Sequence, residues 1–206
     1  MIFYCIRHGQ TVSNAIGRIQ GQSDSPLSNL GKRQCEAVAE ALAELPIDAI
    51  YASPLRRAID SAACLAARLN LELRLDDRLM EINAGLFQGL AWEEIEKLHP
   101  AEARLWKSHD PEYCIPRGES RADVARRAEA VFRDIHRAGH DSVIVMAHGG
   151  VLSAALKALL EIPPRLNPFS LENGSITTLA WDADVKLLSL NQTGHLADLY
   201  TAGTEL

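Results

Sequence analysis

Two histidines in this sequence stand in the same local context, after a short apolar run and directly before glycine. His8 ends the opening run in "FYCIRHG", with Arg7 beside it, and His148 ends the run in "SVIVMAHGG". A neutral imidazole can attack phosphorus and form a phosphohistidine, and an arginine can bind phosphate oxygens through paired N–H donors. A single dipeptide of either kind is a weak signal, so further residues are needed.

Three further polar residues supply chemistry that would complement the histidines. Arg57 is the second arginine after "YASPL", Glu81 lies in the loop-like stretch "DDRLMEINAGLFQGL", and Asn14 lies in the long polar segment after the first run. A carboxylic acid can protonate a leaving alkoxide and then withdraw a proton from water, while arginine and asparagine bind anions. Alone, each has an ordinary interpretation as a helix charge, a surface acid or a turn residue.

Alternating strand-like and helix-like patterns predict the elements that would bring these residues together. The apolar runs 2–6, 49–52, 71–75 and 142–147 are typical of strands, and helical spacing follows most of them, at 28–46, 55–69, 119–139 and 151–160. The runs 175–181 and 185–190 predict a hairpin. This alternation favours a mainly parallel sheet with helices on both faces, whose ligands bind outside the carboxyl ends of the strands. The candidate residues lie just past those ends, so we expect them to meet at one rim.

Composition excludes several classes of partner. The chain has 206 residues, 47% of them apolar, which favours one compact domain over residues 1–206. Its formal net charge of −6 argues against nucleic acid and anionic membranes as partners. No signal peptide or membrane span is predicted, and the sequons at Asn173 and Asn191 are interpreted as chance matches. We therefore expect a cytoplasmic protein.

Metal chemistry is not indicated by the sequence. The four cysteines are far apart and have no metal-ligand spacing, which favours reduced thiols over a metal centre or a disulfide framework. They are Cys5, Cys35, Cys64 and Cys114. The histidine pairs 99/109 and 136/140 lack partners at ligand spacing. We expect no metal and no cofactor.

The motifs, taken in order, resemble those of the histidine phosphatase superfamily, the phosphoglycerate mutase-like enzymes. They are "RHGQTVSN", "GRIQGQSDSPLSNLGKRQ", "YASPLRRAIDSA", "RLMEINAGLFQGL", "RGESRADVARR", "VIVMAHGG" and "ENGSITTL". The match covers nearly the whole chain. It implies a three-layer α/β/α sandwich with a mostly parallel sheet and an antiparallel edge, and phosphohistidine chemistry without a metal.

The resemblance also implies roles for the catalytic candidates. By motif, His8 would be the nucleophile, Arg7 a phosphate ligand and Glu81 the proton donor. The register of the S-x-L-x-R-A pattern places the family's arginine on Arg57 and not on the arginine before it. His148 would be the second histidine of the phosphate pocket.

Four more positions are implied to bind substrate. Asn14 matches a further phosphate ligand, and Gln20 and Gly21 match the loop that touches substrate in the family. Gly149, beside the second histidine, completes this set.

The motifs favour a phosphatase over a mutase. The chain is shorter than the glycolytic mutases, has Gly150 where those enzymes have asparagine, and lacks their aromatic and basic residues after Glu81. We expect hydrolysis of small-molecule phosphomonoesters through a phosphohistidine, with interconversion of 3- and 2-phosphoglycerate as the alternative. An inactive phospho-ligand binder and a protein phosphohistidine phosphatase stay open as minor alternatives.

We expect the substrate to be a small phosphorylated metabolite, and the sequence leaves its alcohol open. A helical insert at about 90–117 is expected over the active site. Enzymes of similar architecture act on phosphoserine, on ribazole phosphate, on glucosyl-3-phosphoglycerate or on a broad range of esters. Ala84 weakens the phosphoserine assignment, because phosphoserine-specific enzymes have a histidine there. A homodimer through an edge strand such as the C-terminal hairpin stays open.

Overall fold

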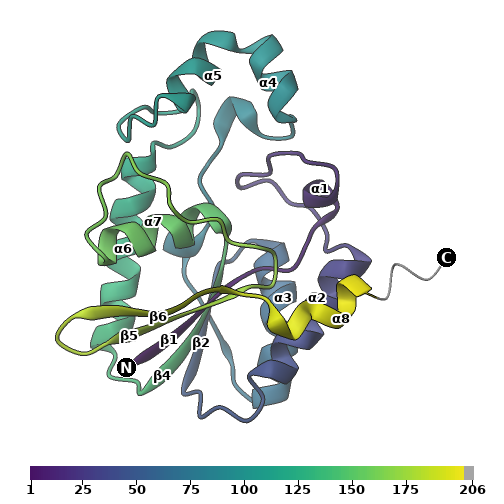
Figure 1. Ribbon diagram of the computed structural model, residues 1–206, viewed down its shortest axis with the longest axis vertical. Helices are drawn as coiled ribbons and strands as arrows, with labels where there is room; N and C mark the ends of the chain where they lie inside the picture. Colours follow the sequence, from purple (N-terminus) through teal and green to yellow (C-terminus); the bar gives the residue numbers. More distant parts are fainter. Residues whose placement is uncertain (202–206) are drawn as a thin grey trace.

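The centre of the fold is a six-stranded sheet in the order β3-β2-β4-β1-β5-β6 (Figure 1). The computed structural model describes residues 1–201, so residues 202–206 of the predicted domain lie outside the described part. The strands are β1 (Ile2–Arg7), β2 (Ala49–Ala52), β3 (Leu73–Leu75), β4 (Ser142–Ala147), β5 (Ile176–Trp181) and β6 (Val185–Gln192). The first four strands are parallel, and β5 and β6 form an antiparallel edge. This confirms the predicted sheet.

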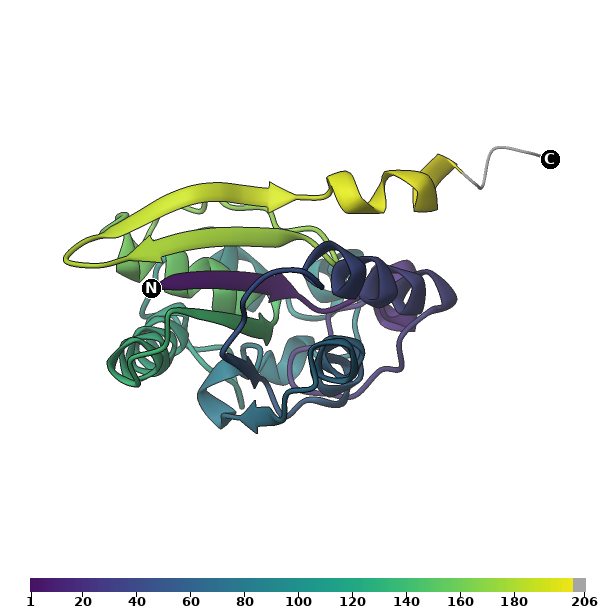
Figure 2. The same cartoon turned by 90° about the horizontal axis from the view of Figure 1, so that it is seen from below.

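Helices cover both faces of the sheet, as the alternating pattern predicts (Figure 2). The longer ones are α2 (Asn29–Ala41), α3 (Arg56–Leu69), α6 (Arg121–Arg137) and α7 (Gly149–Leu159). One buried apolar cluster joins the sheet to α2 and α3, and a second joins its other face to α6 and α7. The molecule is therefore the expected three-layer α/β/α sandwich.

Alternation along each central strand builds these two cores. Phe3 and Cys5 of β1 belong to the cluster with α6 and α7, and Ile6 belongs to the cluster with α2 and α3. In β4, Val145 belongs to the cluster with α6 and α7, and Met146 belongs to the cluster with α2 and α3. Because successive side chains of a strand point to opposite faces, a strand covered on both sides must be apolar throughout.

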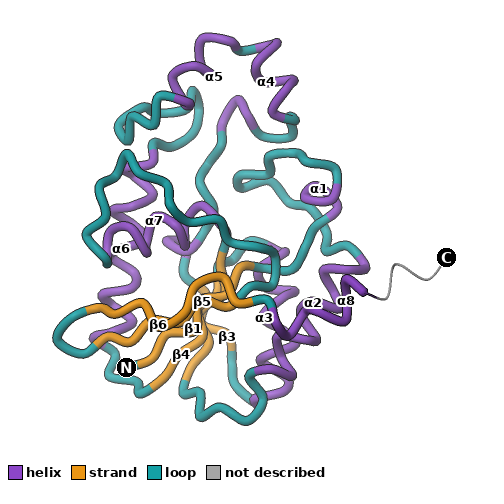
Figure 3. Tube along the Cα trace, viewed as in Figure 1, coloured by secondary structure: helices purple, strands orange, loops and turns teal. Residues whose placement is uncertain are grey.

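The segment expected as a helical insert contains α4 (Trp92–Leu98) and α5 (Pro100–Lys107). They lie at the far end of the molecule from the hairpin loop (Figure 3). Pro100 begins α5, where its missing N–H costs no helical hydrogen bond. A small apolar cluster containing Phe87, Ile95 and Ile115 holds this segment together.

Two short helices were not expected. The predicted loop 7–26 contains α1 (Val12–Ala15), and α8 (Ala197–Thr201) follows the hairpin. α1 begins at a capping box in which the Thr11 side chain accepts from the Asn14 N–H and the Asn14 side chain accepts from the Thr11 N–H. The T-x-x-N spacing was a usable signal for this turn.

Candidate active site

Strand register brings the two histidines together. Arg7 is opposite Ala147 in the parallel β1–β4 ladder, so His8 and His148 leave the sheet side by side. Both are buried, and their ring centroids are 5.0 Å apart. Ser53 follows β2, the neighbour of β4 on its other side, and reaches the same rim.

His8 keeps one ring nitrogen for chemistry. Its Nδ1 lies 2.7 Å from the Gly9 carbonyl oxygen, so Nδ1 carries the proton and donates, and Nε2 keeps its lone pair. Burial, and then the positive charges of Arg57 and Arg7, hold the pKa of His8 well below its ordinary value. The ring is therefore neutral at neutral pH, which is the nucleophilic form.

Arg57 bridges the two imidazoles. Its Nε lies 3.3 Å from His8 Nε2 and 3.2 Å from His148 Nδ1, and the residue is 1% exposed. Because His148 Nδ1 accepts from this N–H, its Nε2 carries the proton and donates to Ser53 Oγ at 2.8 Å. Burial, His8 and the arginines lower the pKa of His148 as well.

Arg57 also holds the loop that contains two predicted substrate-binding residues. Its Nη1 and Nη2 donate to the carbonyl oxygens of Ser23 at 2.9 Å and Gly21 at 2.7 Å. Gln20 is buried beside them, and its Oε1 has no hydrogen-bond partner among the described residues. Arg56 instead extends outward and forms an ion pair on the surface of α3, so Arg57 is the arginine at the rim.

Arg7 offers an unused donor next to the histidines. Its Nη1 donates to the Leu171 carbonyl oxygen at 2.5 Å, but its buried Nε has no partner within residues 1–201. Burial lowers the pKa of Arg7, and the carboxylate of Glu81 opposes that shift. A Cβ added to Gly149 would lie 3.5 Å from this Nε, which places Gly149 against the guanidinium. An anion bound here would satisfy a donor that is otherwise buried without a partner.

Asn14 reaches the site through a residue that sequence analysis missed. Asn173 Nδ2 lies 3.0 Å from the His8 carbonyl oxygen and 3.3 Å from Asn14 Oδ1. It thus ties the loop after β1 to the segment before β5. Sequence analysis noted Asn173 only as part of a sequon and did not assign it to the site.

Glu81 is held at the N-terminus of α7. Its Oε2 accepts from the Gly150 N–H at 2.9 Å, and its Oε1 accepts from the N–H groups of Val151 at 3.2 Å and Ile82 at 2.8 Å. A Cβ at Gly150 would collide with the carboxylate, so only glycine permits this approach. The helix terminus offers N–H groups that helical bonding leaves without partners, and an acceptor belongs there.

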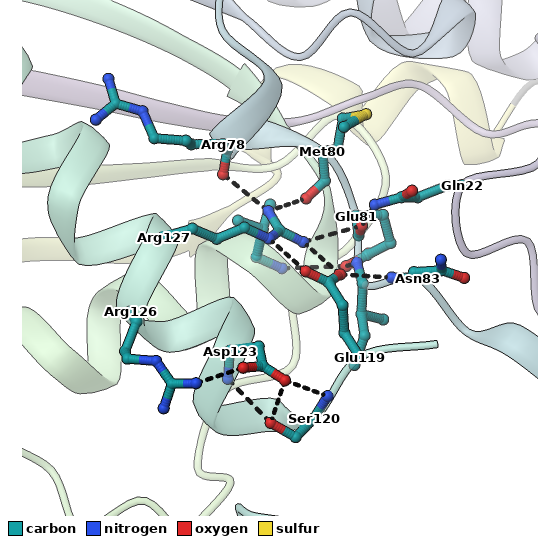
Figure 4. A network of polar contacts seen from close by, with 12 residues as sticks. Gln22, Arg78, Met80, Glu81, Asn83, Glu119, Ser120, Asp123, Arg126 and Arg127 are labelled. Carbon is teal, nitrogen blue, oxygen red and sulfur yellow. Dashed lines mark hydrogen bonds and ion pairs between the residues drawn. The ribbon is translucent and has the colours of Figure 1, made fainter. Parts of the chain in front are cut away.

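Arg127 of α6 fixes the backbone that carries Glu81 (Figure 4). Its Nη1 donates to the carbonyl oxygens of Arg78 at 2.8 Å and Met80 at 2.6 Å, and its Nη2 donates to the carbonyl oxygen of Glu81 at 3.1 Å. The carboxylate of Glu119 pairs with Nε and Nη2, each at 3.0 Å. Sequence analysis missed Arg127 and Glu119 as residues of the site.

The signal for Arg127 lies in its helical spacing. It follows Val124 by three residues and precedes Val131 by four, so it shares the inward, apolar face of α6. A charge on such a face needs a buried partner and is a candidate for a structural or functional role.

A cleft of about 760 Å³ opens at this rim. Arg7, Glu81 and Gly149 line one end of it, and Trp106 and His109 from the predicted insert line it as well.

Among residues 1–201, no three His, Cys, Asp or Glu side chains are grouped as metal ligands would be. No helix in that range has the length and apolar character needed to cross a membrane.

Comparison with known proteins gives the family. A sequence profile described as "Histidine phosphatase superfamily (branch 1)" matches residues 3–193. A glucosyl-3-phosphoglycerate phosphatase of Mycolicibacterium vanbaalenii is 39% identical over 77% of this chain and 73% of its own length. A Yersinia enterocolitica relative named "Probable phosphoglycerate mutase GpmB" is 34% identical, over 94% of each chain.

A solved structure agrees with the sequence relatives. The mycobacterial glucosyl-3-phosphoglycerate phosphatase in complex with VO3 superposes with a TM-score of 0.85 and 36% identity, covering 93% of this chain and 99% of that one. The shared fold and the profile match lead to the same conclusion: this chain belongs to the histidine phosphatase superfamily and is a phosphatase, a phosphoric monoester hydrolase.

Proposed function

We propose that this phosphatase hydrolyses small phosphomonoesters through a phosphohistidine formed at Nε2 of His8, without a metal ion. The observation that supports it most is a neutral, buried imidazole flanked by Arg7 and Arg57. Two guanidinium groups can neutralise a phosphate dianion and the charge that develops in the transition state, which is the electrostatic work a metal does in other phosphatases.

In the first step, the lone pair of His8 Nε2 forms the N–P bond. The P–O bond of the ester breaks, and its electron pair stays on the leaving oxygen. The incoming phosphate displaces the Nε–H of Arg57 from His8, and that donor then binds a phosphate oxygen. Burial, and then the neighbouring positive charges, lower the pKa of His148, and a phosphate dianion beside the ring opposes that shift and favours its protonated, donating form.

Glu81 handles the protons in both steps. In its protonated form it turns from the N-terminus of α7 and donates to the leaving oxygen, which departs as the alcohol. The resulting carboxylate takes a proton from water as the water oxygen attacks phosphorus. The N–P bond then breaks, its electron pair returns to His8, and phosphate is released.

We place three further properties with this proposal. The segment of α4 and α5 would cover the cleft, because Trp106 and His109 line it. A cytoplasmic setting agrees with four cysteines present as thiols. A homodimer would use β6, which lies at the edge of the sheet.

The test is turnover of p-nitrophenyl phosphate in excess EDTA, together with acid-labile labelling by a 32P-phosphomonoester. Wild type should do both, and His8→Ala should lose the label and on the order of a thousand-fold of turnover. Inhibition by EDTA that magnesium reverses would overturn the metal-free mechanism. Labelling retained by His8→Ala would overturn the assignment of the nucleophile.

Mutase activity is the alternative, because one relative is named as a mutase. The discriminating measurement follows 3-phosphoglycerate, 2-phosphoglycerate and free phosphate in one reaction. Phosphate release without interconversion supports the phosphatase, and rapid interconversion with little free phosphate supports the mutase. Glucosyl-3-phosphoglycerate is the first natural ester to test, since it names the M. vanbaalenii relative.

A further inference from the structure

The cleft at the rim continues along α7, away from the phosphate site. Gly150, Ser153 and Lys157 all line it, at the three- and four-residue spacing of one helix face. A rise of 1.5 Å per residue puts the backbone of Lys157 roughly 10 Å beyond that of Gly150. Arg121, the first residue of α6, also lines the cleft. Two cations thus share a cleft that is also lined by Arg7, Glu81 and Gly149 of the candidate active site.

Arg121 is held in place and yet has an unused donor. Its guanidinium carbon lies 3.3 Å from the centre of the Trp106 ring, and its Nη2 donates to the Trp106 carbonyl oxygen at 3.1 Å. Its Nη1 is buried without a hydrogen-bond partner among residues 1–201. Burial lowers the pKa of this guanidinium to about 10. Such an arrangement costs stability unless an acceptor arrives.

Lys157 adds a second positive charge beside Arg121. Burial, and then the charge of Arg121, lower the pKa of the Lys157 ammonium, so the two cations repel each other. Neither forms an ion pair with any carboxylate of the described chain. Of the acidic residues that line this part of the cleft, Glu129 pairs with Arg133, and Glu112 is exposed. Like charges held together with a buried unpaired donor are typical of an anion-binding site.

We propose that Arg121 and Lys157 bind a second anionic group, a carboxylate or phosphoryl group, on the alcohol part of the substrate. The substrate class is then phosphomonoesters of acidic alcohols, with the reacting phosphate at His8 and the second anion further along α7. This inference rests on the proposed function, because the same cleft must bind an ester at its other end. Arg126 also lines the cleft, but its guanidinium is paired with Asp123, so it is excluded from the subsite.

The test compares esters that differ in charge and hardly in shape. 4-Carboxyphenyl phosphate carries the second anion, 4-carbamoylphenyl phosphate replaces it with a neutral amide, and 4-(phosphonomethyl)phenyl phosphate replaces it with a phosphonate. Wild type should hydrolyse at least one of the two anionic esters with a kcat/KM about ten-fold above that of the amide, the scale of one charge-assisted contact. The better anionic ester identifies the group that the subsite prefers.

Variants then assign the effect to the two cations. Arg121→Gln and Lys157→Met should each bring the ratio of anionic to neutral ester close to one, and Arg121→Lys should retain part of it. The ratio within one variant does not depend on how much of the protein is folded. Arg126→Gln removes a charge from the same cleft and should keep the wild-type ratio.

The outcomes separate this inference from the function on which it rests. If wild type hydrolyses none of the three esters, the proposed function is wrong. If it hydrolyses them with equal kcat/KM, the phosphatase stands and the subsite is overturned. A fall in the ratio for Arg126→Gln as large as for Arg121→Gln also overturns the subsite, because the preference would then come from the general field of the cleft.

Discussion

At the scale of single residues, Arg7 and Arg57 act in two ways at the proposed site. In the proposed mechanism, Arg7 and Arg57 provide positive charge for a phosphate dianion. Burial, and then that same charge, lower the pKa of His8 and keep its ring unprotonated. The proposed nucleophile is therefore neutral at pH values where a solvent-exposed histidine would begin to protonate. Arg57 also donates to the carbonyl oxygens of Gly21 and Ser23, so it links the proposed phosphate site to the neighbouring loop.

Arg127 is a positioning residue, because it reaches Glu81 only through backbone carbonyl oxygens and its other partner is the carboxylate of Glu119. Arg127→Lys keeps the charge but loses the fork of N–H donors. We expect roughly ten-fold lower kcat for alkyl phosphates, whose leaving oxygen needs a proton, and a smaller loss for p-nitrophenyl phosphate. Arg126→Lys is the matched control and should behave as wild type on both. An equal loss on both substrates would mean that Arg127 is merely structural.

At the scale of elements, the first turn of α7 forms one functional unit with Glu81. Gly150 contributes both an N–H donor and the space into which the carboxylate fits. Gly150→Ala should displace the carboxylate and lower turnover of alkyl phosphates by about ten-fold or more. Alanine has a higher helix propensity than glycine, so the loss would not come from a weakened helix. The measurement is kcat for alkyl esters against p-nitrophenyl phosphate.

Gly194→Ala is the control for this substitution, because a Cβ there meets nothing within 4 Å. It should leave both rates at the wild-type level. If Gly150→Ala turns over alkyl phosphates as wild type does, Glu81 does not need this position for catalysis, and the proton-donor assignment is weakened accordingly.

Elements with local patterns could be predicted from the sequence, and those with distant causes could not. The run "SVIVMA" gave β4 its observed bounds, Ser142–Ala147. α7 begins at Gly149, two residues before the predicted start at 151. The prediction omitted the two glycines because glycine has a low helix propensity. In the structure, the carboxylate of Glu81 accepts from the N–H groups of this first turn and stabilises it. β3 is shorter than the run 71–75 that predicted it.

The same distinction applies to the candidate site. His8 and His148 could be placed at one rim, because parallel strands bring their carboxyl ends to one edge. The contact of Asn173 with His8 joins residues 165 positions apart, and no periodicity encodes it. Arg127 likewise reaches Glu81 across 46 positions, although its inward place on α6 was visible in the sequence.

At the scale of the whole molecule, the two histidines at the rim of the sheet make folding stability depend on pH. His8 and His148 are buried, and the pKa of each lies well below its ordinary value of 6.5. The unfolded chain therefore binds more protons than the folded one below pH 6.5, and folding stability must fall as the pH falls through that range. Ion-paired carboxylates such as Asp76, with a pKa below 3.8, affect stability only at lower pH.

We therefore expect the free energy of unfolding to decrease between pH 7 and pH 5 by up to about 1.4 kcal/mol per pH unit for each buried imidazole. His195, half-buried with a lowered pKa, adds a smaller part in the same direction. Urea unfolding at constant ionic strength measures this slope. His148→Asn removes one titrating ring and should flatten the slope, whatever its effect on stability at pH 7. Two results would contradict the burial of these histidines in the neutral form: a flat slope for wild type between pH 7 and pH 5, or the same slope for His148→Asn as for wild type. Either result would also contradict the neutral form of His8, which attack on phosphorus requires.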